Sequence, residues 1–123
     1  MVISEQGLGD TIQFMRYIPY LIERGFKITL FVEEKLHSLI KISNIHQNPL
    51  SKGIATFRRE GYWLPVLSLP KILNVSNSLP IITKPYIKTS KDLVDRWRLM
   101  FDKEKKPIIG INWQGNPNVE KEG

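Results

Sequence analysis

The chain has 123 residues, of which 41% are hydrophobic and 24% charged, and these values indicate a globular domain with a core and exclude a disordered segment. It contains no cysteine, which excludes disulfides and thiolate metal sites and is compatible with a cytoplasmic location. The net charge of +6 permits anionic ligands, but the basic residues are scattered without interleaved aromatic residues, so we expect no nucleic-acid partner.

The most informative stretch is residues 5–11, Glu-Gln-Gly-Leu-Gly-Asp-Thr. The short apolar run before it, residues 1–4, predicts a strand, and the run after it, residues 12–24, predicts a long helix. A glycine-rich turn between a strand and a helix places backbone N–H groups and the Asp10 carboxylate at the mouth of a sheet. Open α/β sheets bind their ligands at that mouth.

The helix over residues 12–24 carries signals at both ends. Asp10 is expected to be its N-cap, with Gln13 at the position of a capping-box partner. Pro19 lies inside the run and predicts a kink or an irregular turn. Gly25 is expected to end the helix as a C′ residue.

Residues 27–32 are rich in β-forming residues and predict a second buried strand, which ends at Glu33. A short helix is expected over residues 36–42. Strands and helices that alternate at this spacing favour right-handed βαβ units. We therefore predict an α/β protein, a three-layer Rossmann-like domain with a mainly parallel sheet.

The middle of the chain gives weaker signals. Residues 61–69 form an apolar stretch expected to pack under the mouth of the sheet, and Trp63 and Trp97 are expected in the core. The other expected elements are a polar link over residues 45–53, a short strand over 54–57, a helix over 69–73, a loop over 74–80, an edge strand over 85–88 and a helix from 89 or 90 to about 101 with Leu93, Trp97 and Met100 on one face.

The end of the chain resembles the start of another α/β unit. Residues 102–106 are charged and predict a linker, and residues 107–113 predict a buried strand before a turn over 114–117. An apolar strand without a following helix seeks a sheet edge. We expect residues 108–113 either to join the sheet of this chain or to pair with a second copy in a homodimer.

These residues resemble a known family. Residues 4–14, Ser-Glu-Gln-Gly-Leu-Gly-Asp-Thr-Ile-Gln-Phe, are similar to the start of the glycosyltransferase-like domain that follows tetratricopeptide repeats in many bacterial proteins. Such domains are related to the heptosyltransferases and, more distantly, to the O-linked N-acetylglucosamine transferases. The likeness continues in order through residues 16–19, 67–70, 85–87 and 97, and ends in Ile-Gly-Ile-Asn-Trp-Gln-Gly-Asn-Pro at 109–117.

The resemblance implies a GT-B fold, in which two Rossmann-like domains face each other across a cleft. Residues 1–104 would be the acceptor-side domain, and residues 105–123 a linker with the first strand and loop of the donor-side domain. The chain would then be a fragment of an enzyme that moves a sugar from a nucleotide-sugar donor to an acceptor hydroxyl, with no further cofactor. Because the donor-side domain would be missing, we expect this fragment alone to be inactive.

The resemblance also assigns roles to residues. Asp10 matches the aspartate that serves as general base in heptosyltransferases. Candidate substrate contacts are Gln6, Gly7, Gly9 and Gln13 on the first loop and helix, and Gln114 and Asn116 on the donor-side loop. Each has a plainer alternative: an N-cap for Asp10, positive-φ turn geometry for the glycines, capping or surface positions for Gln6 and Gln13, and the end of a strand for the loop at 113–116.

Two other classes stay open. A dinucleotide-binding Rossmann domain would use the glycines at 7 and 9 and the acid Glu33, but Ile12 stands where that motif needs glycine or alanine. A binding or scaffold module without activity would use the same fold. A metal site is not expected, because His37 and His46 lack acidic neighbours at ligand spacing. No apolar run approaches the roughly 18 residues that a membrane span needs.

Overall fold

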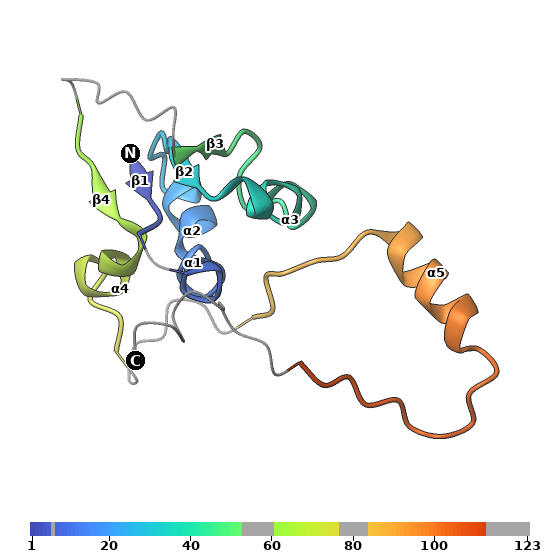
Figure 1. Ribbon diagram of the computed structural model, residues 1–123. Coiled ribbons are helices and arrows are strands. Elements are labelled where there is room, and N and C mark those ends of the chain that lie inside the picture. The colour runs from blue at the N-terminus through green and yellow to red at the C-terminus, as the bar shows by residue number, and fades with distance from the viewer. Residues whose placement is uncertain (6, 53–60, 77–83, 113–123) are drawn as a thin grey trace, which may run out of the picture. The chain divides into compact units, whose positions relative to one another are not determined.

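The computed structural model describes residues 1–5, 7–52, 61–76 and 84–112 (Figure 1). The chain forms two compact units, Met1–Ser90 and Lys91–Gly123. The first unit contains helices and a four-stranded parallel sheet. The predicted α/β class with a parallel sheet is therefore confirmed, and the arrangement is consistent with a Rossmann-like fold.

The sheet has the order β3-β2-β1-β4, with every neighbouring pair parallel. Its strands are β1 (Val2–Ile3), β2 (Leu30–Val32), β3 (Leu50–Ser51) and β4 (Leu64–Pro65). The two predicted strands at 1–4 and 27–32 are present but shorter than expected. Strand β3 lies inside the segment predicted as a polar link. The predicted strand over 54–57 lies outside the described residues.

The helix predicted over residues 12–24 is two helices, α1 (Leu8–Phe14) and α2 (Tyr17–Glu23). The irregular turn predicted from Pro19 is present, but it lies four residues earlier. Proline has no N–H to give to the carbonyl of Met15, and its ring crowds that carbonyl. The N–H of Ile18 instead donates to Met15 at 3.0 Å, and the chain starts a new helix.

Gly25 is the C′ residue of α2, as predicted, and adopts a φ of 84°. The Gly25 N–H donates to the Ile22 carbonyl at 2.9 Å, and the Phe26 N–H donates to the Leu21 carbonyl at 3.1 Å, which is a Schellman motif. Two other helices, α3 (His37–Ile42, preceded by the 3₁₀ turn η1, Glu34–Leu36) and α4 (Leu69–Ile72, preceded by η3, Val66–Ser68), end in the same way, at Asn44 and Asn74.

The core lies between the sheet and the helices that pack on it. Met15, the C-cap of α1, and Ile18 in α2 are completely buried, and so are Leu30 and Val32 from β2. Other buried residues of this core are Val2, Leu36, Ile40, Ile45, Val66 and Leu69. The predicted helices over 36–42 and 69–73 are thus confirmed, and both contribute apolar residues to this core.

The segment predicted as an edge strand over 85–88 forms no strand. Side chains hold it in place instead: the Lys88 N–H donates to the Ser43 hydroxyl at 2.9 Å, and the Tyr86 hydroxyl donates to the Ile12 carbonyl. Pro85 can donate no ladder hydrogen bond, which disfavours a strand at this position.

The second unit contains α5 (Lys91–Phe101), close to the predicted bounds, and no residue of this helix is buried. The prediction that two tryptophans belong to the core is wrong, since Trp63 is 58% exposed and Trp97 is 53% exposed. Trp97 stacks on Phe101 in its own helix, with ring centroids 5.6 Å apart. Residues 107–112 form no strand and are exposed, so within this range the predicted buried strand is also wrong.

Candidate functional site

The loop after β1 lies at the topological switch point of the sheet. Strand β1 is flanked by β2 on one side and β4 on the other, so the order of strands reverses beside it. The Ser4 N–H donates to the Phe31 carbonyl at 2.9 Å and fixes the inner end of the loop. In open parallel sheets, ligands bind outside the carboxyl ends of the strands at such a point. The predicted mouth is therefore where the fold favours a site.

Asp10 lies in the first turn of α1, but it is not the N-cap. Gly7 holds that position, with φ −59° and ψ 170°, and no side chain caps the helix. The helix begins before Asp10 because the Thr11 N–H donates to the Gly7 carbonyl at 3.1 Å. The capping prediction is wrong for Asp10, and with it the capping-box role of Gln13. Both side chains are exposed, and no capping bond holds the Asp10 carboxylate.

Thr11 fixes the outer end of the same loop. Its side chain is completely buried, and its hydroxyl donates to the Gly7 carbonyl at 3.2 Å. A threonine that donates back to the carbonyl four residues earlier is common in helices. Sequence reasoning misses this supporting role of Thr11, and the one local signal for it is its position directly after Asp10.

The two glycines do not need positive φ angles, contrary to the turn geometry that the sequence suggested as an alternative. Neither Gly7 nor Gly9 is in the left-handed region, and a Cβ atom built on either meets nothing within 4 Å. The described part of the chain therefore gives no steric reason for glycine at these positions. Glycine would matter there for a molecule that approaches the backbone closely.

The other predicted site residues are placed less completely. Gln13 lies one helical turn after Asp10, at the i, i+3 spacing that puts two side chains on one helix face. Gln6, Gln114 and Asn116 lie outside the described residues. The structure thus brings Gly7, Gly9, Asp10 and Gln13 together on one loop and helix.

Charged side chains meet beyond the ends of β2 and β3. The ammonium of Lys52 is 2.9 Å from a carboxylate oxygen of Glu33. This hydrogen bond, and then the positive charge of Lys52, hold the pKa of Glu33 below its ordinary value. Glu33, the acid that a dinucleotide-binding domain would use for the ribose, is therefore engaged by a lysine. Ile12, at the position where that motif needs a small residue, packs against the core.

Ser4 is a buried polar group at the mouth that the sequence did not single out. It is only 1% exposed, and its hydroxyl has no hydrogen-bond partner among the described residues. Within those residues, no group of three or more His, Cys, Asp or Glu side chains could hold a metal ion. No helix in the described part of the chain is long and apolar enough to cross a membrane.

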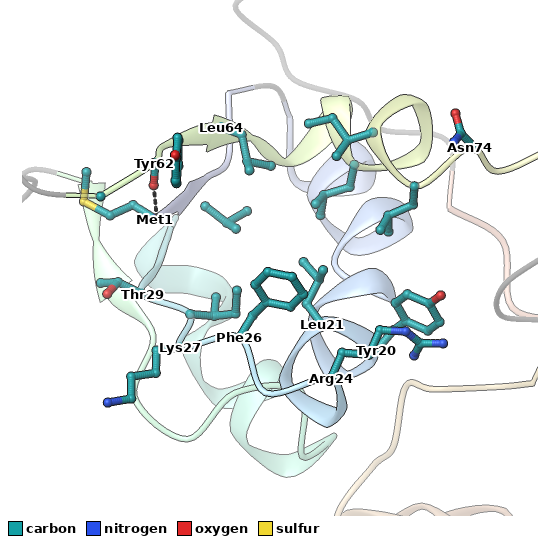
Figure 2. A pocket seen from close by; sticks show the side chains of 16 residues that line it. Met1, Tyr20, Leu21, Arg24, Phe26, Lys27, Thr29, Tyr62, Leu64 and Asn74 are labelled. Carbon is teal, nitrogen blue, oxygen red and sulfur yellow. Dashed lines mark hydrogen bonds between the residues drawn. The ribbon is translucent and has the colours of Figure 1, made fainter.

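A large apolar cavity lies at the opposite end of the strands (Figure 2). Its volume is about 800 Å³, and Met1, Thr29 and Tyr62 line it at or just before the starts of β1, β2 and β4. Helix α2 contributes Tyr20 and Leu21. No local sequence pattern predicts this cavity, because its walls come from segments that are far apart in the chain.

Comparisons of the chain with protein-family models, with curated proteins and with solved structures found no match.

Proposed function

We propose that this chain is the acceptor-side half of a cytoplasmic GT-B glycosyltransferase related to the heptosyltransferases. In this proposal the chain forms a three-layer, Rossmann-like domain. The observation that carries the proposal is the exposed carboxylate of Asp10 in the first turn of the helix that follows the switch-point strand. Three features support it: the strand order, the open space at Gly7 and Gly9, and the sequence resemblance of the same loop.

In this mechanism the acceptor hydroxyl approaches the loop after β1. Its oxygen attacks the anomeric carbon of the donor sugar, the bond from that carbon to the nucleotide phosphate breaks, and the hydroxyl proton passes to the Asp10 carboxylate. The leaving nucleotide carries the electron pair of the broken bond. In the same proposal Gln13 donates a hydrogen bond to the acceptor from the helix face that carries Asp10.

The exposure of Asp10 has a consequence for this mechanism. Transfer of the acceptor proton to this carboxylate needs a cover that keeps bulk water out of the reaction. Asp10 has no such cover within the described part of the chain. Cover would come from the bound acceptor and from a donor-side domain with the nucleotide-sugar, which is why the chain alone is expected to be inactive.

The test uses the longer protein in which this half would act. We expect Asp10→Asn to lower kcat by roughly 100-fold or more, the range for loss of a general base, with little change in KM for the donor. Asp92→Asn is the matched control, because Asp92 also lies in the first turn of a helix and is exposed. Unchanged turnover of Asp10→Asn would remove Asp10 from the mechanism.

A binding module without activity is the second candidate. The lack of cover over Asp10 favours it, because an acceptor can bind to an exposed loop without any transfer. It predicts that the longer protein binds a nucleotide-sugar or a glycan but shows no release of nucleotide. Transfer of labelled sugar to any hydroxyl acceptor would exclude it, and binding of NAD(H) would instead revive the dinucleotide-binding alternative.

A further inference from the structure

Helix α5 of the second unit carries one continuous apolar face. Leu93, Trp97 and Met100 follow one another at i, i+4 and i+7, and Val94 and Phe101 widen this stripe. No residue of the helix is buried, and Met100 is 61% exposed. The rings of Trp97 and Phe101 stack on each other, so the two largest apolar side chains lie together. A contiguous exposed apolar surface of this kind marks a site of interaction with a protein or a membrane.

The charged residues of α5 are ordered around this face. Arg96 and Arg98 stand directly before and after Trp97. Because a helix turns once in about 3.6 residues, these two arginines border the apolar face on its two sides. Asp92 and Asp95 lie on the side away from the face. The helix therefore has cations at both borders of its apolar face and acids opposite it.

The border cations can reach an anionic surface. Both arginines are exposed, and Arg98 lies 3.8 Å from the Asp95 carboxylate in an exposed pair that contributes little. Arginine lays its aliphatic stem along apolar surface while its guanidinium reaches polar groups such as lipid phosphates. Residues 103–106, directly after the helix, add three exposed lysines and one glutamate. Each cation close to an anionic bilayer adds attraction.

Charge also distinguishes between possible occupants of this face. Two copies of α5 packed face to face would place the arginine borders of one helix beside those of the other, and like charges repel. An anionic bilayer instead presents phosphates to both borders. Its interfacial region also favours aromatic rings such as those of Trp97 and Phe101. Helices with this distribution lie in the plane of the interface, with the apolar face inserted by roughly 5–10 Å.

We propose that α5 is an interfacial helix that binds the surface of an anionic lipid bilayer. Its apolar face enters the boundary between headgroups and acyl chains, Arg96 and Arg98 contact lipid phosphates, and Asp92 and Asp95 face the water. The helix lies on the bilayer and does not cross it, since no helix in the described part of the chain is long and apolar enough to do so. This inference does not rest on the proposed glycosyltransferase activity.

Co-sedimentation of the full chain with lipid vesicles tests the proposal. The probes are vesicles of phosphatidylcholine with an equal share of phosphatidylglycerol, and vesicles of phosphatidylcholine alone. The chain is expected to bind the anionic vesicles at least about 10-fold more tightly, because each cation near the surface contributes a factor of about 5. Added salt is expected to weaken this binding, since it screens the charges.

Two double variants test the border cations. Arg96→Gln combined with Arg98→Gln is expected to weaken binding to the anionic vesicles by at least about 10-fold and to leave binding to neutral vesicles unchanged. Lys41→Gln combined with Lys71→Gln removes the same charge from exposed positions on α3 and α4, and is expected to change neither. An equal loss in the two double variants would show that only the net charge of the chain matters.

The apolar face is tested on the same helix. Trp97→Gln combined with Met100→Gln is expected to abolish vesicle binding while circular dichroism remains that of the wild type, because both side chains are exposed. Leu99→Gln is the control, since Leu99 is 80% exposed and lies one turn after Asp95, away from the face. It is expected to leave binding unchanged.

Trp97 also reports its own position. With Trp63→Phe and Trp113→Phe it is the only tryptophan of the chain. Brominated acyl chains in the anionic vesicles are expected to quench its fluorescence.

Three results would overturn the proposal: equal affinity for the two kinds of vesicle, no quenching of Trp97, or a loss of binding in Leu99→Gln. Two further outcomes would assign the face to another occupant. If the chain dimerises without lipid, Trp97→Gln makes it monomeric and vesicles do not bind, the face is an interface between two copies. If vesicles do not bind but soluble polyglutamate binds through Arg96 and Arg98, the face belongs to an acidic protein partner.

Discussion

Tyr86 reaches back across 74 residues of sequence to α1, where its hydroxyl donates to the carbonyl of Ile12. The guanidinium of Arg16 lies 4.7 Å from the centroid of the same ring. Together with the hydrogen bonds between Ser43 and Lys88, this contact holds residues 84–88 against α1 and the end of α3 within the first unit. The segment that leads toward α5 is therefore anchored by side chains and not by a strand.

Tyr86→Phe is expected to destabilise the chain by about 1 kcal/mol, because it removes one hydrogen bond and keeps the ring under Arg16. Urea unfolding followed by circular dichroism measures the change. Tyr62→Phe is the matched control, since Tyr62 is 92% exposed and its hydroxyl is in water. Equal free energies of unfolding for the two variants would show that the Tyr86 hydroxyl contributes nothing.

The pair of Glu33 and Lys52 makes stability depend on pH. The pKa of Glu33 is lowered, because Lys52 donates a hydrogen bond to its carboxylate and attracts its charge. A depressed folded-state pKa contributes stability above the unfolded value, and this contribution is lost as pH falls through the folded pKa. Lys52→Gln is therefore expected to lower stability near neutral pH, and the difference from the wild type is expected to vanish in acid.

The pKa of Glu33 itself provides a graded check on this pair, measured by carbon-detected NMR titration of its carboxyl group. Lys52→Gln is expected to raise the pKa toward its ordinary value. Lys35→Gln is expected to raise it less, because Lys35 acts only through its charge and is the weaker cause. A larger effect from Lys35 would contradict the ion pair seen here.

Two glycine substitutions are expected to change stability in opposite directions. Gly25→Ala places a Cβ atom at a φ of 84°, where an L-residue is strained, and is expected to cost about 1–2 kcal/mol. Gly9→Ala lies in α1 at an ordinary helical φ, and its Cβ meets nothing within 4 Å, so it is expected to stabilise the chain by up to about 1 kcal/mol.

Gly9→Ala also bears on the proposed function. If an acceptor approaches the backbone at Gly9, the longer protein with this substitution is expected to be more stable and yet less active. Thermal unfolding and a sugar-transfer assay on the same preparation measure the two effects. Full activity together with higher stability would show that no ligand needs the space at this position.

Met15 tests the position of the core. Its side chain is completely buried between the helices and the sheet, so Met15→Ala is expected to cost about 2–5 kcal/mol. Met100→Ala removes the same atoms from a side chain that is 61% exposed, and is expected to change the free energy of unfolding by less than about 0.5 kcal/mol. Urea titrations of both variants provide the comparison.

Much of the fold could be predicted because strong local signals agreed with it. The alternation of apolar runs and turns predicted parallel pairing, and Gly25 marked the end of α2. Strand β3 was missed because two residues, Leu50 and Ser51, carry no periodicity and pair only because β2 lies beside them. The run at 107–112 was misassigned because its composition favours a strand, whereas a strand also requires a partner.

The position of the loop that carries the candidate site could be predicted, but its geometry could not. The Gly-Leu-Gly-Asp sequence correctly marked the loop at the switch point, but the start of α1 at Leu8 left Asp10 inside the first turn. Local preference for aspartate at an N-cap was outweighed by the bond from Thr11 to Gly7. The apolar cavity could not be predicted, because only the folded chain brings the turn at Phe26 toward β4 and α4.

The three helix ends with left-handed residues also affect the unfolded chain. Only one of them, Gly25, is glycine, whereas Asn44 and Asn74 adopt the same backbone region with a side chain attached. Asparagine restricts an unfolded backbone more than glycine does, so less conformational entropy is lost when these two turns form. In the described part of the chain, two of these three left-handed helix ends are therefore partly preorganised before any tertiary contact exists.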